Sequence, residues 1–268
     1  MTSNAFPGSA PHSGIVFTDL DGTLLDFHSY APSPEAVGEL GEMLRRRVLV
    51  IPVSSKTADE IRHMTQSLPF TGPAIAEGGA VVLAADGSVS VSGPARSELV
   101  ELLRRLQAGG WPLRGMSEMS VQEVVELTGL DAMAAERAMM RAASEPFIFS
   151  TSSGGKDCNG LDRAVAAAGA TLVRGGRFWH LHGKGIDKGA GVRSLLVRIS
   201  NDDVPPTAAI GDAWNDLAMF EEVDMSFILG DAVDSRMLPE GVIRVAASGP
   251  PGFVEAVQHI KNSWFPSA

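Results

Sequence analysis

The sequence of 268 residues has little of several features that mark particular classes of protein. Its one cysteine, Cys158, excludes an intramolecular disulfide and suits a reducing cytoplasmic compartment. No apolar stretch approaches the ~20 residues that a membrane-spanning helix needs. The first fourteen residues lack the basic and apolar segments of a secretion signal, so we expect a tail there. Cys158 has no histidine close to it in sequence and is interpreted as structural or incidental.

Basic residues are also in the minority. The chain has 22 Lys and Arg against 32 Asp and Glu, which gives a formal net charge of −10. This balance disfavours nucleic acid and anionic membranes as partners. It does not exclude a phosphorylated substrate, because a bound Mg²⁺ and a few basic side chains can reverse the local charge inside a cleft.

What is present is organised around residues 14–26. Residues 15–17 form a short apolar run, which is typical of a strand buried on both faces, and Asp19 and Asp21 follow where it ends. Gly22 then allows a sharp turn. Because ligands bind beyond the carboxyl ends of parallel strands, we expect both carboxylates at a crevice. One carboxylate suits a nucleophile and the other a proton shuttle, and both are hard oxygen ligands for Mg²⁺.

The spacing of apolar runs predicts the fold class. Further runs at 48–53, 207–210, 225–229 and 242–246, separated by helical patterns, predict a doubly wound, parallel-sheet, Rossmann-like α/β core. Between them lies an α+β insertion of roughly a hundred residues, which is longer than a loop should be. We therefore predict a core in two parts, residues 1–85 and 184–268, and a cap domain at 86–183.

Local signals predict some of the element ends. Ser33-Pro34 and the capping-box pattern of residues 57–60 each predict the start of a helix. Asp86-Gly87 predicts a hairpin turn, and a polar strand at 88–92 follows it in the predicted cap. The Ala- and Met-rich composition of residues 132–144 predicts a helix.

Three more polar motifs fall at predicted strand ends or helix starts. Ser54 and its neighbours lie between a strand end and a capped helix, where backbone amides favour anions. Lys188 begins a predicted helix, and the stretch Gly211–Asp216 follows a predicted strand. Alone, Ser54 would be taken for a helix-start residue and Lys188 for a surface lysine. The occurrence of all the motifs in order is what favours a phosphate site.

Together these motifs resemble those of the haloacid dehalogenase superfamily of phosphohydrolases. Residues 19–23, Asp-Leu-Asp-Gly-Thr, match the Asp-x-Asp-x-Thr motif at every fixed position. The resemblance implies that Asp19 attacks phosphorus and that Asp21 transfers the proton. It also implies that Ser54 donates to a phosphoryl oxygen and that Lys188 stabilises the charge. The implied Mg²⁺ ligands are Asp19, Asp21, Asp212 and Asp216.

The insertion resembles the C2-type cap of the sugar-phosphatase branch of that superfamily. Shorter signatures at 53–57, 77–79, 144–147 and 176–180 resemble the mannosyl-3-phosphoglycerate phosphatases, although residues 54–56 are Ser-Ser-Lys where many of the superfamily's enzymes have Thr-Gly-Arg. The resemblance implies Mg²⁺-dependent hydrolysis of mannosyl-3-phosphoglycerate to mannosylglycerate and phosphate, with Glu77 accepting hydrogen bonds from sugar hydroxyls. The expected substrate-binding residues are Gly22, Ser55, Lys56, Glu77, Gly78, Gly79, Arg141, Arg174, Arg177, His180 and Asn215.

Three other functions stay open on the sequence. They are a general sugar-phosphate or sucrose-phosphate phosphatase of the same fold, a phosphomutase that returns the phosphoryl group to its substrate, and a phospho-ligand binder without activity. The intact pair of Asp19 and Asp21 argues against the binder, because binding alone needs no proton shuttle. The sequence does not fix the oligomeric state.

Overall fold

The computed structural model describes residues 12–150, 160–199 and 204–266, so Cys158 and most of the expected N-terminal tail lie outside the described residues. The core is a five-stranded parallel sheet in the order β12-β11-β10-β1-β2. Its strands are β1 (Gly14–Thr18), β2 (Val48–Pro52), β10 (Thr207–Gly211), β11 (Met225–Leu229) and β12 (Ile243–Val245). The predicted doubly wound core is confirmed.

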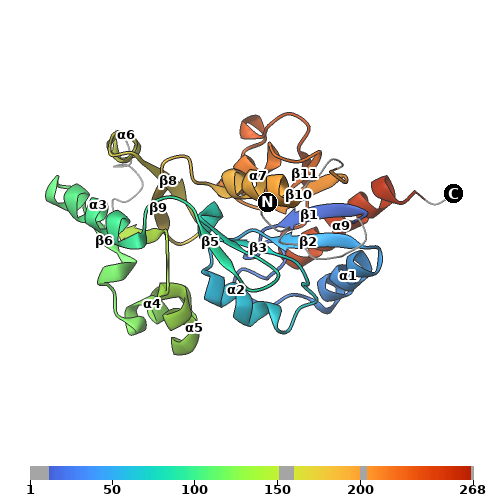
Figure 1. The fold of residues 1–268 in the computed structure, drawn as a ribbon, viewed down its shortest axis with the longest axis horizontal. Helices are drawn as coiled ribbons and strands as arrows, with labels where there is room; N and C mark the ends of the chain where they lie inside the picture. The colour runs from blue at the N-terminus through green and yellow to red at the C-terminus, as the bar shows by residue number, and fades with distance from the viewer. Residues whose placement is uncertain (1–11, 151–159, 200–203, 267–268) are drawn as a thin grey trace, which may run out of the picture.

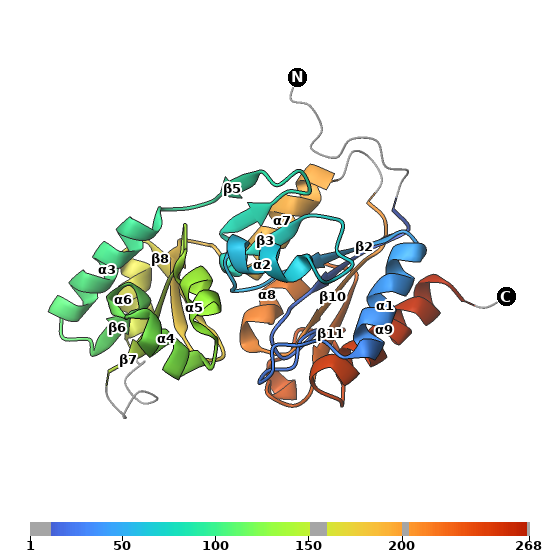
Figure 2. The ribbon, with the colours of Figure 1, turned by 90° about the horizontal axis from the view of Figure 1, so that it is seen from below.

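Helices cover both faces of this sheet (Figure 2). Alternate side chains of each strand point to opposite faces, so Val16 and Ile15 belong to different apolar clusters. The first cluster includes side chains of α1 (Pro34–Arg45), α2 (Ala58–Thr65) and α9 (Gly249–Trp264). The second includes side chains of α7 (Lys188–Ile199) and α8 (Leu217–Phe220). The sheet is therefore rigidly held where its strands deliver the polar side chains.

Two predicted helix starts are confirmed by their capping bonds. Ser33 Oγ accepts from the amide of Ala36 at 3.2 Å at the start of α1. Thr57 and Glu60 form a reciprocal capping box at the start of α2, with bonds of 3.2 and 2.8 Å. These caps fix where the chain after β2 enters α2, beside the expected phosphate-binding residues.

A small antiparallel sheet connects the core to the insertion. It contains β3 (Ala74–Ala76), β4 (Val81–Leu83) and β5 (Val89–Val91), with the short 3-10 helix η1 (Glu77–Gly79) between the first two. Asp86-Gly87 forms the predicted hairpin turn, with Gly87 at φ +84°. This turn folds β5 back onto β4, so β5 lies in the small sheet, although the sequence pattern assigned it to the cap.

The insertion folds as a separate α+β body on one side of the core (Figure 1). Its antiparallel sheet has the order β6-β7-β9-β8, with strands β6 (Leu113–Gly115), β7 (Glu145–Phe149), β8 (Ala170–Arg174) and β9 (Trp179–Gly183). The helices α3 (Arg96–Ala108) and α6 (Leu161–Ala167) pack on this sheet. The insertion of an α+β cap is confirmed, while the boundaries at 86 and 183 stay a prediction.

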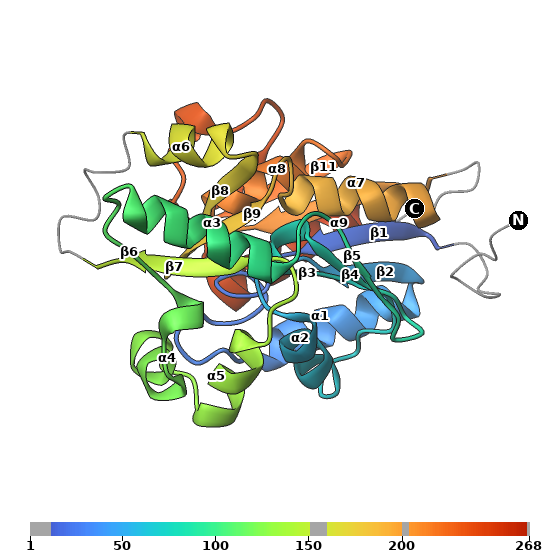
Figure 3. The ribbon, with the colours of Figure 1, turned by 60° about the vertical axis from the view of Figure 1, so that its left-hand side comes forward.

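Two further cap helices, α4 (Val121–Thr128) and α5 (Ala132–Met139), lie toward the core. Figure 3 shows α5 beside the core helix α2, and the two helices are in contact. The helix α5 ends at Met139, although its composition predicted a helix to Ser144. The backbone of residues 142–144 instead makes hydrogen bonds to other elements, including one from Arg96 N to Ala142 O at 2.7 Å.

The remaining described elements are three 3-10 helices, η2 (Met116–Glu118), η3 (Trp214–Asp216) and η4 (Ser235–Met237). None of the helices within residues 12–150, 160–199 and 204–266 combines the length and apolarity needed to cross a bilayer.

Candidate active site

The site lies at the carboxyl ends of three neighbouring core strands. Asp19 follows β1 directly, and its backbone amide donates to Ile210 O in β10 at 2.9 Å. Ser54 follows β2, and Asp212 follows β10. Because β1 lies between β2 and β10, three residues far apart in the sequence come together at one edge of the sheet. The sequence predicted that these residues share one edge, because each follows a predicted strand.

Lys188, at the first position of α7, joins two of these carboxylates. Its Nζ lies 2.5 Å from Oδ1 of Asp19 and 2.5 Å from Oδ1 of Asp216. The lysine is only 2 % exposed, so burial alone would lower its pKa. The two carboxylates reverse that effect and raise the pKa of Lys188 above its ordinary value. Lys188 is therefore a permanent positive charge at the side of Asp19.

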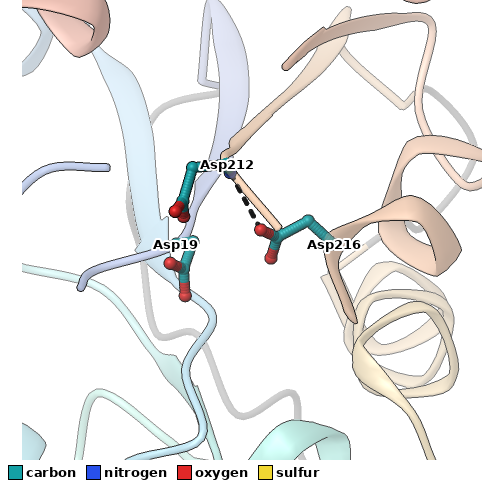
Figure 4. A group of neighbouring side chains, drawn as sticks. All are labelled: Asp19, Asp212 and Asp216. Atoms are coloured by element: carbon teal, nitrogen blue, oxygen red, sulfur yellow. Dashed lines mark hydrogen bonds between the residues drawn. The ribbon is translucent and has the colours of Figure 1, made fainter. Parts of the chain in front are cut away.

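Asp19, Asp212 and Asp216 form a cluster that fits a divalent cation (Figure 4). One oxygen of each lies within 4.8 Å of the others. Burial raises the pKa of Asp19 well above its ordinary value, and burial with the nearby Asp216 raises the pKa of Asp212 to about 6. A cation would relieve this repulsion, and hard carboxylate oxygens are the ligands that Mg²⁺ prefers. The residues therefore fit Mg²⁺, although Asp21, predicted as a fourth ligand, is not part of the cluster.

Asp216 is oriented by backbone amides as well as by Lys188. Its Oδ2 accepts from the amides of Asp212 and Ala213, each at 2.9 Å. Gly211 permits this approach, because a Cβ there would lie 2.4 Å from Cγ of Asp216. Gly22, at φ +86°, does the same for Asp212, whose Oδ2 would lie 2.5 Å from a Cβ. Gly22 thus supports the cluster instead of lining the pocket.

Asp21 turns toward the chain after β2. Its Oδ2 lies 2.8 Å from Nζ of Lys56, and that ammonium also lies 4.9 Å from the ring centroid of Tyr30. Burial would lower the pKa of Lys56, but Asp21 and Glu60 raise it overall. The other oxygen of Asp21, Oδ1, is buried and has no hydrogen-bond partner within the described part of the chain. A buried carboxylate oxygen without a hydrogen-bond partner is suited to accept a hydrogen bond from a ligand.

Core and cap together enclose a cavity of about 130 Å³ in front of these carboxylates. From the cap side, Arg177 lies with its Cζ 4.4 Å from the ring centroid of Phe27 and donates to Phe27 O at 3.2 Å. The Tyr30 hydroxyl donates to Thr128 O in the cap at 2.9 Å. The predicted site residues that line the cavity are Asp19, Asp21, Ser54, Ser55, Lys56, Arg141, Arg177, His180, Asp212 and Asn215.

His180 and Arg141 complete the cap wall of the cavity. His180 is buried, and burial followed by the charge of Arg141 lowers its pKa well below the ordinary value. The imidazole is therefore neutral at physiological pH, and its Nδ1 has no partner among the described residues. Arg141 donates to Ser55 O at 3.1 Å and to Ser144 Oγ at 2.9 Å, so this guanidinium bridges the two domains.

Besides Gly22, four predicted substrate-binding residues do not line the cavity. Arg174 is exposed at the end of β8, with its Cζ 5.7 Å from the ring centroid of Trp179. Glu77 is buried, and its carboxylate accepts from cap residues 142–144 instead of facing the cavity. Gly78 packs toward His182, and a Cβ on Gly79 would lie 1.9 Å from Asp187 O. These two glycines allow close packing at the base of α7.

The sequence interpretation did not identify Phe27, Tyr30 and Glu60 as lining residues. Tyr30 carried one usable signal, since it is the single tyrosine of the chain and follows the Asp19 motif closely. Its φ of +55° is uncommon for a residue other than glycine and marks the loop as unusual. No comparable local signal marks Phe27 or Glu60.

Comparisons with known proteins agree with this geometry. Residues 161–237 match the family of haloacid dehalogenase-like hydrolases. A glucosyl-3-phosphoglycerate/mannosyl-3-phosphoglycerate phosphatase of Persephonella marina is 30% identical over 92% of this chain and 97% of its own. The phosphatase of the same name from Methanococcoides burtonii is 29% identical over 92% of this chain and 96% of its own.

Solved structures agree in the fold. A haloacid dehalogenase-like hydrolase from B. subtilis superimposes with a TM-score of 0.71 at 17% identity, over 92% of this chain and 99% of its own. The structure of Thermoplasma acidophilum 0175 also gives 0.71, at 20% identity over 95% of this chain and 99% of its own. The family match and the relative from P. marina agree with the strand-end carboxylates, Lys188 and the inserted cap. They establish that the chain belongs to the haloacid dehalogenase-like hydrolases, as a phosphoric monoester hydrolase of that family.

Proposed function

We propose that this phosphatase hydrolyses mannosyl-3-phosphoglycerate to mannosylglycerate and inorganic phosphate, with the glucosyl compound as a second substrate. The observation that carries the proposal is one cavity with two different halves. Its core half holds Asp19 and Asp21, and Lys188 is hydrogen-bonded to Asp19. Its cap half holds the cations Arg141 and Arg177. The relatives from P. marina and M. burtonii, both named for these two substrates, support the same choice.

In the first step, Asp19 attacks phosphorus, so a bond forms between its carboxylate oxygen and phosphorus while the ester bond breaks. Asp21 donates a proton to the departing glycerate oxygen. In the second step, the now ionised Asp21 takes a proton from water as that water attacks the aspartyl phosphate. Inorganic phosphate leaves and Asp19 is regenerated.

The surrounding residues supply positive charge and orientation. Lys188 is bonded to Asp19 and stays charged, so it stabilises the phosphoryl oxygens as negative charge shifts. Ser54 lines the cavity, and its hydroxyl would donate a hydrogen bond to a phosphoryl oxygen. Asp19, Asp212 and Asp216 would hold Mg²⁺, which would supply further positive charge to stabilise the phosphoryl group.

The substrate carries a carboxylate that a simple hexose phosphate lacks. Arg177, Arg141 and Lys56 are basic residues that line the cavity. Arginine binds carboxylates with its planar fork of donors, which makes Arg177 and Arg141 suitable partners. A site with such cations should discriminate strongly against analogues without the carboxylate, because its buried charges would remain unpaired.

An arginine pair in the cap tests this assignment. Arg177→Ala should lower kcat/KM for mannosyl-3-phosphoglycerate by roughly 10²-fold while changing that for mannose 6-phosphate far less. Arg174→Ala is the matched control, because Arg174 is an exposed arginine at the end of β8, three residues before Arg177, and does not line the cavity. Equal losses for both substrates with Arg177→Ala would instead favour a general sugar phosphatase. A selective loss with Arg174→Ala would assign the carboxylate to Arg174 and contradict the role of Arg177.

A further inference from the structure

Glu77 is a deeply buried carboxylate that the proposed mechanism does not use. It is 1 % exposed, yet its carboxylate accepts three hydrogen bonds, all from the cap. Oε1 accepts from the amide of Ala142 at 2.7 Å. Oε2 accepts from the amide of Ala143 at 3.0 Å and from the hydroxyl of Ser144 at 2.6 Å. A buried carboxylate needs such donors, so the core residue and the cap segment 142–144 hold each other in place.

The backbone of the same residue holds the loop that follows β2. The amide of Glu77 donates to Lys56 O at 2.8 Å, and the amide of Gly78 donates to Ser54 O at 2.9 Å. Glu77 has a φ of +47°, a conformation that costs free energy for a residue with a side chain and persists where neighbours impose it. Glu77 therefore binds the phosphate-binding loop through its backbone and the cap through its side chain.

The cap segment that receives Glu77 is itself firmly attached to the cap. The backbone amide of Arg96 donates to Ala142 O, and its side chain donates to Met139 O at 2.6 Å and to Glu145 Oε2 at 2.7 Å. Glu145 is the first residue of the central strand β7. Through these bonds, the segment that binds Glu77 is connected to the cap sheet and not only to a loop.

Arg141 connects this network to the cavity. It lines the cavity, donates to Ser55 O in the core, and donates to the same Ser144 hydroxyl that donates to Glu77. The hydroxyl of Ser144 is therefore shared between the buried carboxylate and the cavity arginine. Both the position of Arg141 and the position of the Ser54–Lys56 loop depend on one residue that does not line the cavity.

We infer that Glu77 is a positioning residue, which sets the cap arginine Arg141 against the phosphate-binding loop and so fixes how the non-phosphate part of the substrate is bound. This inference rests on the proposed function in assigning Arg141 to that part of the substrate. It replaces the expected role of Glu77 as an acceptor for sugar hydroxyls.

Hydrogen exchange tests the attachment without any substrate. Ala142 is an exposed residue, so slow exchange of its amide in the wild-type protein would have to come from its bond to Glu77. Glu77→Gln replaces one acceptor oxygen by a donor, and it should accelerate exchange of the Ala142 and Ala143 amides by roughly tenfold or more. Exchange within β7 and β9 should stay unchanged. Fast exchange at both alanines in the wild-type protein would overturn the inference.

Kinetics test whether the attachment acts through Arg141. Ser144→Ala should raise KM for mannosyl-3-phosphoglycerate by about tenfold, and leave kcat/KM for p-nitrophenyl phosphate within about twofold, because that probe has no group for Arg141. In an Arg141→Ala background, Ser144→Ala should raise KM no further. Ser120→Ala is the matched control. It removes the hydroxyl that caps α4, whose hydrogen bonds stay within the cap, and it should change neither KM for mannosyl-3-phosphoglycerate nor kcat/KM for p-nitrophenyl phosphate.

A merely structural role of Ser144 and Glu77 would lower both activities together with thermal stability, and that result would overturn the inference. Additive effects of Ser144→Ala and Arg141→Ala would also overturn it. If mannosyl-3-phosphoglycerate is not hydrolysed at all, the proposed function fails, while the exchange rates of the Ala142 and Ala143 amides still decide whether Glu77 holds the cap.

Discussion

In the proposed mechanism, the chemistry depends most directly on Asp19 and Lys188. Lys188 is bonded to Oδ1 of Asp19, and Asp19 is nearly buried at the end of β1. Asp19→Asn keeps the size of the side chain but removes the attacking charge. Turnover should therefore fall by roughly three orders of magnitude or more, which a phosphate-release assay would measure. A folded Asp19→Asn protein with near-normal turnover would show that Asp19 is not the nucleophile.

The raised pKa of Asp212, about 6, makes a prediction about pH and metal binding. The folded, metal-free protein binds a proton at Asp212 more tightly than the unfolded chain does, whose aspartates titrate near about 3.9. The stabilising contribution of this proton is thus complete below about pH 4 and is lost as pH rises through about 6. Above that pH the carboxylate is ionised and free to bind Mg²⁺.

Excess Mg²⁺ should therefore raise the thermal unfolding midpoint clearly at pH 7.5 and much less at pH 5. Thermal unfolding with and without Mg²⁺ at the two pH values measures this. Asp212→Ala, which removes the ligand, should abolish most of the shift at pH 7.5. An equal Mg²⁺-induced shift at both pH values would contradict the assignment of Asp212 as a ligand.

At the scale of residues, the sequence predicted which polar residues lie at strand ends and helix starts better than it predicted which residues they bind. Asp19, Ser54, Lys188 and Asp212 were found because each follows a strand or begins a helix, which is a local property. The partner of Glu77 could not be found this way, because Ala142 lies 65 positions further along the chain. A buried carboxylate in an apolar strand predicts some partner, but only the packing of the cap on the core decides which one.

At the scale of elements, the turn from β10 into η3 is the tightest part of the site. A Cβ on Gly211 would meet Asp216, whose carboxylate orients Lys188. Gly211→Ala should lower the free energy of unfolding by about 1–3 kcal/mol and reduce activity at the same time, because Asp216 must move. Gly38→Ala in α1 is the control, since a Cβ there meets nothing within 4 Å. Chemical denaturation and phosphate release measure both effects.

If Gly211→Ala were as stable and active as the wild-type protein, the close packing of Asp216 against β10 would not be needed. Gly38→Ala should itself be neutral or slightly stabilising, because alanine favours a helix more than glycine does.

The limits of sequence reasoning at this scale have physical causes. Core strands and capped helices were predicted correctly, because buried apolar runs and capping residues are local signals. The pattern of Ala132–Ser144 predicted one helix, but α5 ends at Met139, where tertiary bonds to Glu77 and Arg96 take over the backbone. The short strand β5 was assigned to the cap because its polar pattern differs from the core strands, although the turn at Gly87 returns it to β4.

At the scale of the whole molecule, cap and core meet through contacts of two kinds. One kind is the buried attachment of residues 142–144 to Glu77. The other kind surrounds the cavity, where Tyr30 donates to Thr128 O and Arg177 donates to Phe27 O. These latter bonds are less deeply buried than those from Ala143 and Ser144 to Glu77, so they should break first when the cavity opens for substrate.

We predict that the cap turns relative to the core while the Glu77 attachment persists. Small-angle scattering should give a smaller radius of gyration with orthovanadate, a phosphate analogue, and Mg²⁺ than with Mg²⁺ alone. Identical scattering in both states would contradict cap movement.

The most direct test of the proposed activity is a comparison of kcat/KM for four compounds. They are mannosyl-3-phosphoglycerate, its glucosyl analogue, mannose 6-phosphate and sucrose 6-phosphate, each measured by phosphate release with Mg²⁺ present. Because the cavity presents Arg141, Arg177 and Lys56 beyond the phosphate-binding groups, the two glycerate compounds should exceed the two simple sugar phosphates by roughly 10²-fold or more. A higher kcat/KM for mannose 6-phosphate or sucrose 6-phosphate than for mannosyl-3-phosphoglycerate would contradict the proposed function.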